Sequence, residues 1–175
     1  MYSSHNPNNF RALNFLSMKE PDDRGRFAYE YLNFDHDEME QCHGWVQWAF
    51  PIDTHSNYNP LAPIIDNTFL HTESSNIISA KLLQQFMKFI GLDSYLDFNP
   101  QRFFEAIDGP YNHNILRISR VLKHLMLTNK QNSAKWLLKS ITDHMIKYYT
   151  KQFNSNTVAY WYTLVYDIDN SNGFF

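Results

Sequence analysis

Two histidines and two arginines recur with the spacing of one helical face between residues 112 and 125. His113, Arg117, Arg120 and His124, here called the basic stripe, follow one another at intervals of four, three and four residues. At about 100° per residue this spacing predicts one narrow stripe of a helix, beside an apolar face that must be buried. Arginines that border a buried face are typical of contacts with a fixed anion, either within the protein or on a ligand.

A second polar stripe follows in the segment between Asp35 and Pro51. Asp35 and Glu38 have the spacing of a capping box, and Pro51 should end the helix that they begin. On this predicted helix the polar residues have the same intervals as the basic stripe; they are His36, Glu40, His43 and Gln47. If the two helices face each other, the Glu40 carboxylate and the Gln47 amide would lie close to the guanidinium groups of Arg117 and Arg120.

The two stripes allow a structural and a functional interpretation. In the first, Glu40 forms a partly buried ion pair with Arg117 or Arg120, and His43 and Gln47 complete the hydrogen bonds. In the second, a pocket binds a small anionic molecule or a peptide carboxylate, aided by a helix N-terminus near Asn112. The candidate ligand-binding residues are His43, Gln47, Trp48, His113, Asn114, Arg117 and Arg120.

Metal binding and catalysis have weaker support in the sequence. The arrangement His36-x3-Glu40-x2-His43 has ligand types at helical spacing, but it is not the H-E-x-x-H motif, so we expect no metal and no cofactor. Cys42 is expected on the buried face, and no G-x-S-x-G or glycine-rich phosphate loop is present. No catalytic residue is assigned, although an enzyme that uses the His and Arg cluster for acid–base chemistry stays an alternative.

The aromatic residues have two interpretations as well. Trp45, Trp48 and Phe50 would make either an aromatic binding cage or part of the core, and the core is favoured because aromatic residues at helix ends are usually buried. Trp48 lies off the apolar arc and is expected to pack under the following loop. Tyr111, Tyr160, Trp161 and Tyr162 are likewise predicted to have a structural role. A protein-interaction scaffold, the third class of function, would instead require an exposed aromatic patch.

Helical periodicity and capping signals occur repeatedly along the chain, and convincing strand alternation is lacking. The sequence predicts an all-α, single-domain helical bundle over residues 10–175, preceded by a disordered segment, 1–9. A long loop rich in Pro and Asn, residues 51–66, follows the second helix. Further helices are expected from Ser75 to Gly91, after Pro100, from Ser133 and over 157–166.

Composition and charge exclude several classes of protein. The formal net charge of -3 argues against general nucleic-acid binding, which needs clustered positive charge. No run approaches the length of a transmembrane helix, and the polar N-terminus has no signal-peptide pattern. The single cysteine, Cys42, cannot form an internal disulfide, which favours a reducing compartment and a soluble, cytoplasmic protein.

Several blocks of residues, in order, resemble the conserved domain of the opioid growth factor receptor family. The blocks are H-x-x-x-Q-W-x-F-P from His43 to Pro51, Asn59-Pro60 with Ala62-Pro63, L-x-x-F-M-x-F-I-G-L from Leu83 to Leu92, His113-Asn114, and Leu116 to Arg120. The resemblance covers about residues 10–150. The opening P-D-D-R-G-R, Pro21 to Arg26, is similar to that of the short single-domain bacterial members.

The resemblance implies a receptor-like binding module. Animal members are described as receptors for the peptide Met-enkephalin, associated with the nucleus and its envelope, and they carry long C-terminal extensions. By resemblance, the expected function here is binding of a peptide or a small anionic ligand, with a protein partner as a further expectation. His43, Gln47, His113, Asn114, Arg117 and Arg120 occupy motif positions of the family, whereas His36 and His124 do not.

Overall fold

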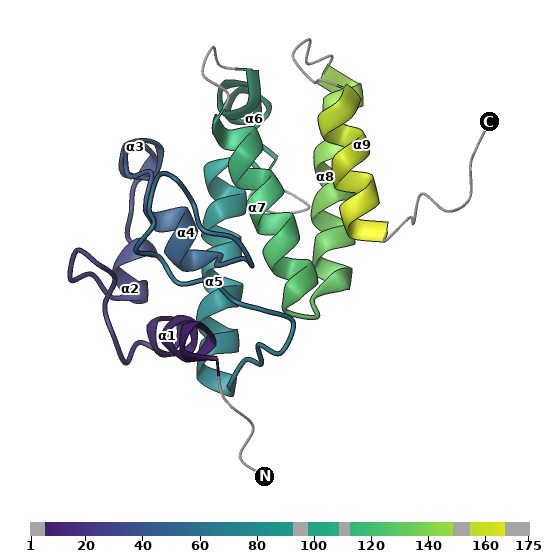
Figure 1. Ribbon diagram of the computed structural model, residues 1–175. Coiled ribbons are helices and arrows are strands. Elements are labelled where there is room, and N and C mark those ends of the chain that lie inside the picture. The colour runs from purple at the N-terminus through teal and green to yellow at the C-terminus, as the bar shows by residue number, and fades with distance from the viewer. Residues whose placement is uncertain (1–5, 93–97, 109–112, 149–154, 167–175) are drawn as a thin grey trace.

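The computed structural model describes residues 6–92, 98–108, 113–148 and 155–166, and these residues confirm the predicted all-α fold (Figure 1). Among them the only strand-like pairing is an isolated bridge between Leu92 and Phe98. The helices are α1 Pro7–Leu16, α2 Ala28–Tyr31, α3 His36–Gln41, α4 Trp45–Ala49, α5 Glu73–Phe89, α6 Pro100–Asp108, α7 His113–Leu127, α8 Gln131–Tyr148 and α9 Ser155–Tyr166.

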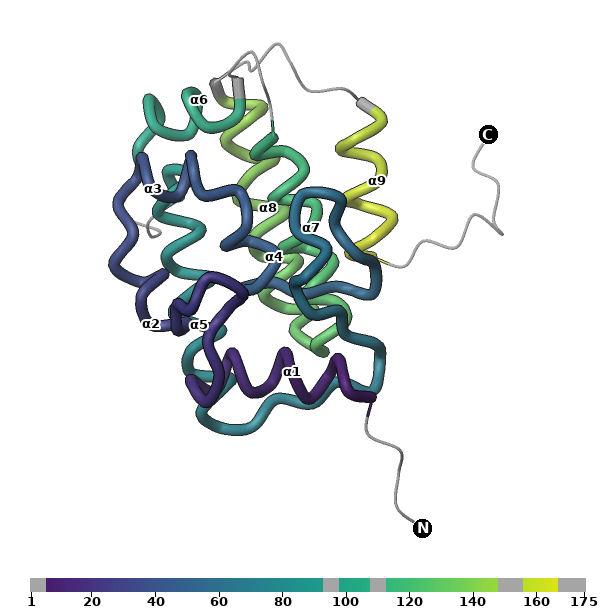
Figure 2. The backbone as a smooth tube through the Cα atoms, turned by 60° about the vertical axis from the view of Figure 1, so that its left-hand side comes forward, coloured from purple at the N-terminus to yellow at the C-terminus, as the bar shows by residue number. Residues whose placement is uncertain are grey.

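The long helices of the C-terminal half form the frame of the molecule. Helices α7, α8 and α9 pack side by side, and α5 runs beside them in the same general direction (Figure 1). Helix α1 crosses the lower part of α5, and the short helices α2, α3 and α4 occupy the remaining side. In Figure 2 the chain between α4 and α5 passes in front of α7. This loop therefore forms a layer over the frame.

Capping interactions explain where several helices begin. Asn6 accepts a hydrogen bond from the backbone of Asn8, and Pro7 occupies the first turn, so α1 begins inside the segment 1–9 that was expected to be irregular. The capping box of Asp35 and Glu38 forms as predicted. The N-cap of α5 is Thr72, three residues before the predicted cap Ser75, and Ser75 completes its capping box.

The helix predicted between Asp35 and Pro51 is broken into α3 and α4, so that prediction was wrong in its continuity. A continuous helix would use the backbone oxygen of Met39 as an acceptor for the amide of His43. Instead the buried indole of Trp45 donates to that oxygen at 3.0 Å, and the amide of His43 turns to Gln41. Gly44 caps α4 next to the Asn59 amide, which would lie 3.1 Å from an added Cβ. The tertiary contact of Trp45 thus replaces a helical hydrogen bond.

The loop between α4 and α5 is fixed to the rest of the protein by polar contacts. Asp66 accepts hydrogen bonds from the side chains of Asn6, Asn9 and Thr68, which lower the pKa of its carboxyl far below the ordinary value. Within the loop the amide of Ile65 donates to the oxygen of Ile52 at 3.0 Å. The loop can therefore hold side chains in fixed positions.

Aromatic side chains fill the centre of the domain. Trp45, Trp48 and Phe50 are at most 1% exposed, so the core interpretation of these three residues is confirmed. Trp45 packs edge-on against both Phe50 and Phe89. This core supports one wall of the pocket described next.

Candidate functional site

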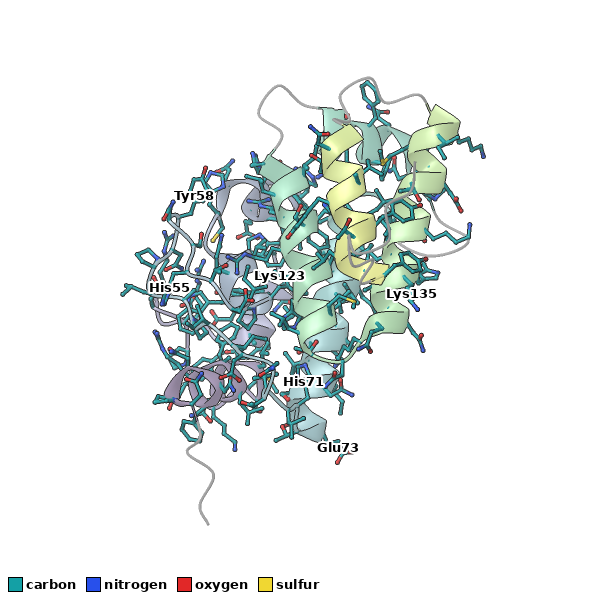
Figure 3. The ribbon with its side chains drawn as sticks, turned by 45° about the vertical axis from the view of Figure 1, so that its right-hand side comes forward. His55, Tyr58, His71, Glu73, Lys123 and Lys135 are labelled. Atoms are coloured by element: carbon teal, nitrogen blue, oxygen red, sulfur yellow. The ribbon has the colours of Figure 1, made fainter. Side chains whose placement is uncertain are left out.

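A pocket of about 680 Å³ lies between the loop, α4 and α7. Figure 3 labels two of the residues that line this pocket, Tyr58 on the loop and Lys123 on α7. Basic, amide, hydroxyl and apolar side chains together line the pocket. They are His43, Val46, Gln47, Ile52, Thr54, Ser56, Asn57, Tyr58, His113, Leu116, Arg117, Ser119, Arg120, Lys123 and Tyr160. Most of the predicted ligand-binding residues therefore line one cavity.

Helix α7 supplies the basic wall, because it stays continuous through the basic stripe. His113, Arg117 and Arg120 line the pocket as the periodicity predicts. His124, the last member of the stripe, is buried and donates from Nδ1 to the backbone oxygen of Pro51 at 2.7 Å. Burial lowers the pKa of His124 to about 3, so this residue is a neutral core histidine.

Arg117 is buried and held mainly by neutral acceptors. Its guanidinium donates to the side-chain oxygen of Asn114 at 3.1 Å and to the backbone oxygen of Glu40 at 3.2 Å. It also donates to Nδ1 of His43 at 3.3 Å and lies over the ring of Phe89. Burial lowers the pKa of Arg117, and the charge of Glu40 opposes that shift. This buried arginine lines the pocket.

The carboxylate of Glu40 does not contact either arginine. It contacts the ring of His113, a contact that is an ion pair when that ring is protonated, and it accepts a hydrogen bond from Asn114 at 3.2 Å. Within the described residues no salt bridge joins Arg117 or Arg120 to a carboxylate. The predicted contact between the two polar stripes is therefore present, but Arg117 makes it with the backbone oxygen of Glu40 and the ring of His43, and the Glu40 carboxylate faces His113 instead of an arginine.

Arg120 is the cation with the fewest partners in this wall. It donates from Nη1 to the backbone oxygen of Phe50 at 3.3 Å, and the described residues provide no other hydrogen bond to it. Burial lowers its pKa to about 10, and no neighbouring acid offsets this effect. The guanidinium is still charged at neutral pH, and most of its N–H donors have no acceptor among the described residues.

Lys123, a pocket residue that sequence analysis missed, already has an acidic partner. Its ammonium lies 2.5 Å from the carboxylate of Asp53 on the loop. The helical period that places Arg120 also places Lys123 one turn further along α7, so the sequence could have predicted Lys123 on the same face. The pairing with Asp53 depends on the course of the loop, which has no local sequence signature.

His43 and Gln47 lie in the pocket as predicted, although they do not share one helix. Burial and the charge of Arg117 lower the pKa of His43, so its neutral ring accepts the guanidinium hydrogen bond. The amide of Gln47 is satisfied when its nitrogen donates to the backbone oxygens of His43 and Gly44, at 2.6 and 3.2 Å. The amide oxygen then lies 3.4 Å from the hydroxyl of Ser56.

Two of the predicted ligand-binding residues do not line the pocket: the buried Asn114, and Trp48. Its indole donates to Asp23 at 2.6 Å, its ring packs on Phe15, and Arg11 lies over it at 4.8 Å. Tyr160 was read as structural, but it is 48% exposed and lines the pocket. The exposed rim also includes Tyr58 and Leu116, for which the sequence contains no periodic signal.

The possible metal ligands His36, Glu40 and His43 do not converge. The ring of His36 stacks on Phe89 at 5.1 Å and faces a separate cavity of about 770 Å³. Within the described part of the chain, no group of three or more His, Cys, Asp or Glu side chains is placed to hold a metal ion. The Asn112 helix terminus lies outside the described residues. None of the described helices has the length and apolarity needed to cross a membrane.

The fold and the site define an all-α domain with a basic pocket beside an exposed apolar rim. Residues 8–171 match the opioid growth factor receptor (OGFr) conserved region, and the chain belongs to this family. The match confirms the resemblance and extends it over nearly the whole chain. Comparison with curated proteins and with solved structures gave no significant match.

Proposed function

We propose that this domain is a binding module that holds a peptide or a small anionic ligand in the pocket between the loop, α4 and α7. The observation that carries the proposal is Arg120, a guanidinium in the pocket wall without an acidic partner among the described residues. An arginine that is mostly removed from water favours a site where an anion completes its hydrogen bonds.

The size and the rim of the pocket support the same proposal. A volume of about 680 Å³ lies within the usual range of ligand sites, roughly 300–1,000 Å³. Three of the residues that line the pocket are well exposed to solvent: Tyr58 is 75% exposed, Leu116 62% and Tyr160 48%. Exposed apolar side chains beside convergent polar groups are typical of ligand sites.

Chemical-shift changes on titration with peptide and metabolite libraries test this function. We expect ligands to perturb amides near His43 and Arg117, and Arg120→Gln to weaken their binding by about tenfold or more. Lys135→Gln is the matched control, because Lys135 lies on α8 (Figure 3), lines no part of this pocket, and is an exposed cation over the Tyr166 ring. The proposal fails if saturating libraries leave the amides near His43 and Arg117 unchanged.

The family relationship supports a receptor-like role for the pocket, and we extend the proposal to that role. A protein partner at the exposed rim is compatible with it. We also propose that the protein acts in the cytoplasm, since Cys42 is a free thiol and a reducing compartment would keep it so. Cell fractionation with a tagged chain tests this location.

Acid–base catalysis is a second candidate function, and one contact favours it. Glu40 pairs with His113, and the His43 ring lies edge-on to His113 at 5.3 Å between centroids. A carboxylate that orients a histidine is a recurring arrangement in general acid–base catalysis. Product formation that is lost in a folded His43→Ala variant would support an enzyme, whereas unchanged product formation would reject this use of His43.

A further inference from the structure

We propose that the ligand of this pocket is an organic monocarboxylate, a single carboxylate attached to an apolar or aromatic body, rather than a phosphate ester. This inference rests on the proposed function and specifies its ligand. It follows from the charge of the pocket, the hydrogen-bonding capacity of Arg120 and the apolar side chains that line the same pocket.

The charges around the pocket leave room for one negative charge. Three cations line it, namely Arg117, Arg120 and Lys123. Two carboxylates lie against this group: Glu40 contacts His113 and Asn114 beside Arg117, and Asp53 is paired with Lys123. At a pH where the histidines carry no charge, these described residues leave one positive charge, so a monoanion balances the pocket and a dianion would leave an excess negative charge.

Arg120 is the residue that would receive the carboxylate. Its contact with Phe50 uses one of five guanidinium N–H donors, and the described residues make no further hydrogen bond with it. None of its nitrogens is among the buried atoms that lack a partner, so the other donors are not sealed inside the protein. A guanidinium fork matches the two oxygens of a carboxylate.

The apolar side chains determine the rest of the ligand. Ile52 from the loop and Leu116 from α7 line the same pocket as Arg120, and Tyr58 and Tyr160 contribute aromatic surface. Burial of an apolar body against these side chains would contribute in proportion to the area removed from water. A carboxylate without such a body, such as acetate, would therefore bind more weakly than an aromatic carboxylate.

Three probes that share one naphthyl body differ in the charge of the attached group. We would measure the affinities of 2-naphthoate, its neutral carboxamide and 2-naphthyl phosphate by calorimetry, at about pH 8 and constant ionic strength, where histidines are neutral and the phosphate is a dianion. We expect 2-naphthoate to bind about tenfold or more tightly than either analogue. Equal or tighter binding of the phosphate or the carboxamide would overturn the inference.

Two variants connect this preference to the named residues. Arg120→Gln should weaken 2-naphthoate by about tenfold and leave the carboxamide nearly unchanged, because only the anion uses the guanidinium. Asp53→Asn releases Lys123 and adds one positive charge, so 2-naphthyl phosphate should gain more affinity than 2-naphthoate. The exposed cation Lys135 provides the control, and Lys135→Gln should change none of the three affinities. If Asp53→Asn left the ratio of the 2-naphthoate and 2-naphthyl phosphate affinities unchanged, the charge argument would be contradicted.

The failure of this inference is distinguishable from failure of the binding function. If 2-naphthyl phosphate binds best and Arg120→Gln weakens it, the pocket binds anions and only the choice of a monocarboxylate is wrong. If no probe binds, and peptide and metabolite libraries also leave the amides near His43 and Arg117 unchanged, the binding function itself is wrong.

Discussion

His124 on α7 and Pro51 at the start of the loop are joined by a buried hydrogen bond of 2.7 Å between Nδ1 and the backbone oxygen. The bond connects the two walls of the pocket, since Arg120 lies one turn before His124 and Ile52 directly follows Pro51. The loop is therefore anchored to the helix that carries the basic residues, and the anchor requires Nδ1 to carry a proton.

This anchor predicts that the protein loses stability in acid. Burial lowers the pKa of His124 to about 3, so between roughly pH 6.5 and 3 the unfolded chain binds a proton that the folded chain does not. The free energy of unfolding should therefore fall as the pH falls through this window. Relative to neutral pH, this residue alone should lower it by about 3 kcal/mol at pH 4. His71, with a pKa lowered to about 4, adds to the same trend.

Urea unfolding at a series of pH values measures this dependence. His124→Asn retains a side-chain donor for Pro51 and removes the titrating group, so its stability should change less between pH 6.5 and 4. His55→Gln is the control, because His55 is exposed on the loop (Figure 3). Identical pH dependence in His124→Asn and the wild type would show that His124 is not responsible.

The two arginines of the pocket should differ in their contributions to stability. Arg117 makes hydrogen bonds to Asn114, Glu40 and His43, so Arg117→Gln should cost about 2–4 kcal/mol and lower the Tm by roughly 5–10 °C. Arg120 makes one such bond, so Arg120→Gln should change stability by less than about 1 kcal/mol or raise it. Thermal unfolding of both variants at matched pH and salt makes the comparison. A larger loss in Arg120→Gln would mean that Arg120 is mainly structural.

The sequence predicts the helices well where local signals decide them. The capping box of Asp35, the proline that opens α6 and the left-handed Gly91 after α5 all depend on neighbouring residues, and all are present. The placement of Arg117 and Arg120 at one pocket depends only on the continuity of α7. The C-terminal segment is also helical, as predicted in the absence of a partner strand.

The remaining features depend on contacts between distant residues. The break between α3 and α4 depends on the Trp45 indole taking the oxygen of Met39, which no periodicity indicates. His124 shares the helical face of Arg117 but turns into the core, because the loop provides the oxygen of Pro51 as its acceptor. The pairing of Lys123 with Asp53 likewise requires the folded loop. All three features depend on tertiary contacts, which helical spacing in the sequence does not determine.

Trp48 should affect stability and leave ligand binding unchanged. Its indole and the amide of Asn59 both donate to Asp23, at 2.6 and 3.2 Å, on a side of the loop that does not line the pocket. Trp48→Phe removes the stronger of the two bonds and should cost about 1–3 kcal/mol. Calorimetry with 2-naphthoate, below the unfolding temperature of the variant, should give the wild-type affinity. Weaker binding of 2-naphthoate by a fully folded Trp48→Phe variant would show that Trp48 takes part in ligand binding.

Gly91 and Gly25 provide a comparison of steric and conformational effects on stability. Both have positive φ, of 84° and 79°, but a Cβ on Gly91 would lie 2.6 Å from the backbone nitrogen of Phe103 and 2.8 Å from the oxygen of Asn99. An added Cβ on Gly25 meets nothing within 4 Å. Gly25→Ala should therefore cost about 1 kcal/mol of backbone strain.

Gly91→Ala carries the same strain and also forces α6 away from the end of α5, so we expect a loss of at least about 3 kcal/mol. Chemical unfolding of the two variants under identical conditions measures the difference. Equal losses would mean that the contact between Gly91 and the start of α6 relaxes at no cost, and that only the left-handed backbone requires glycine at this position.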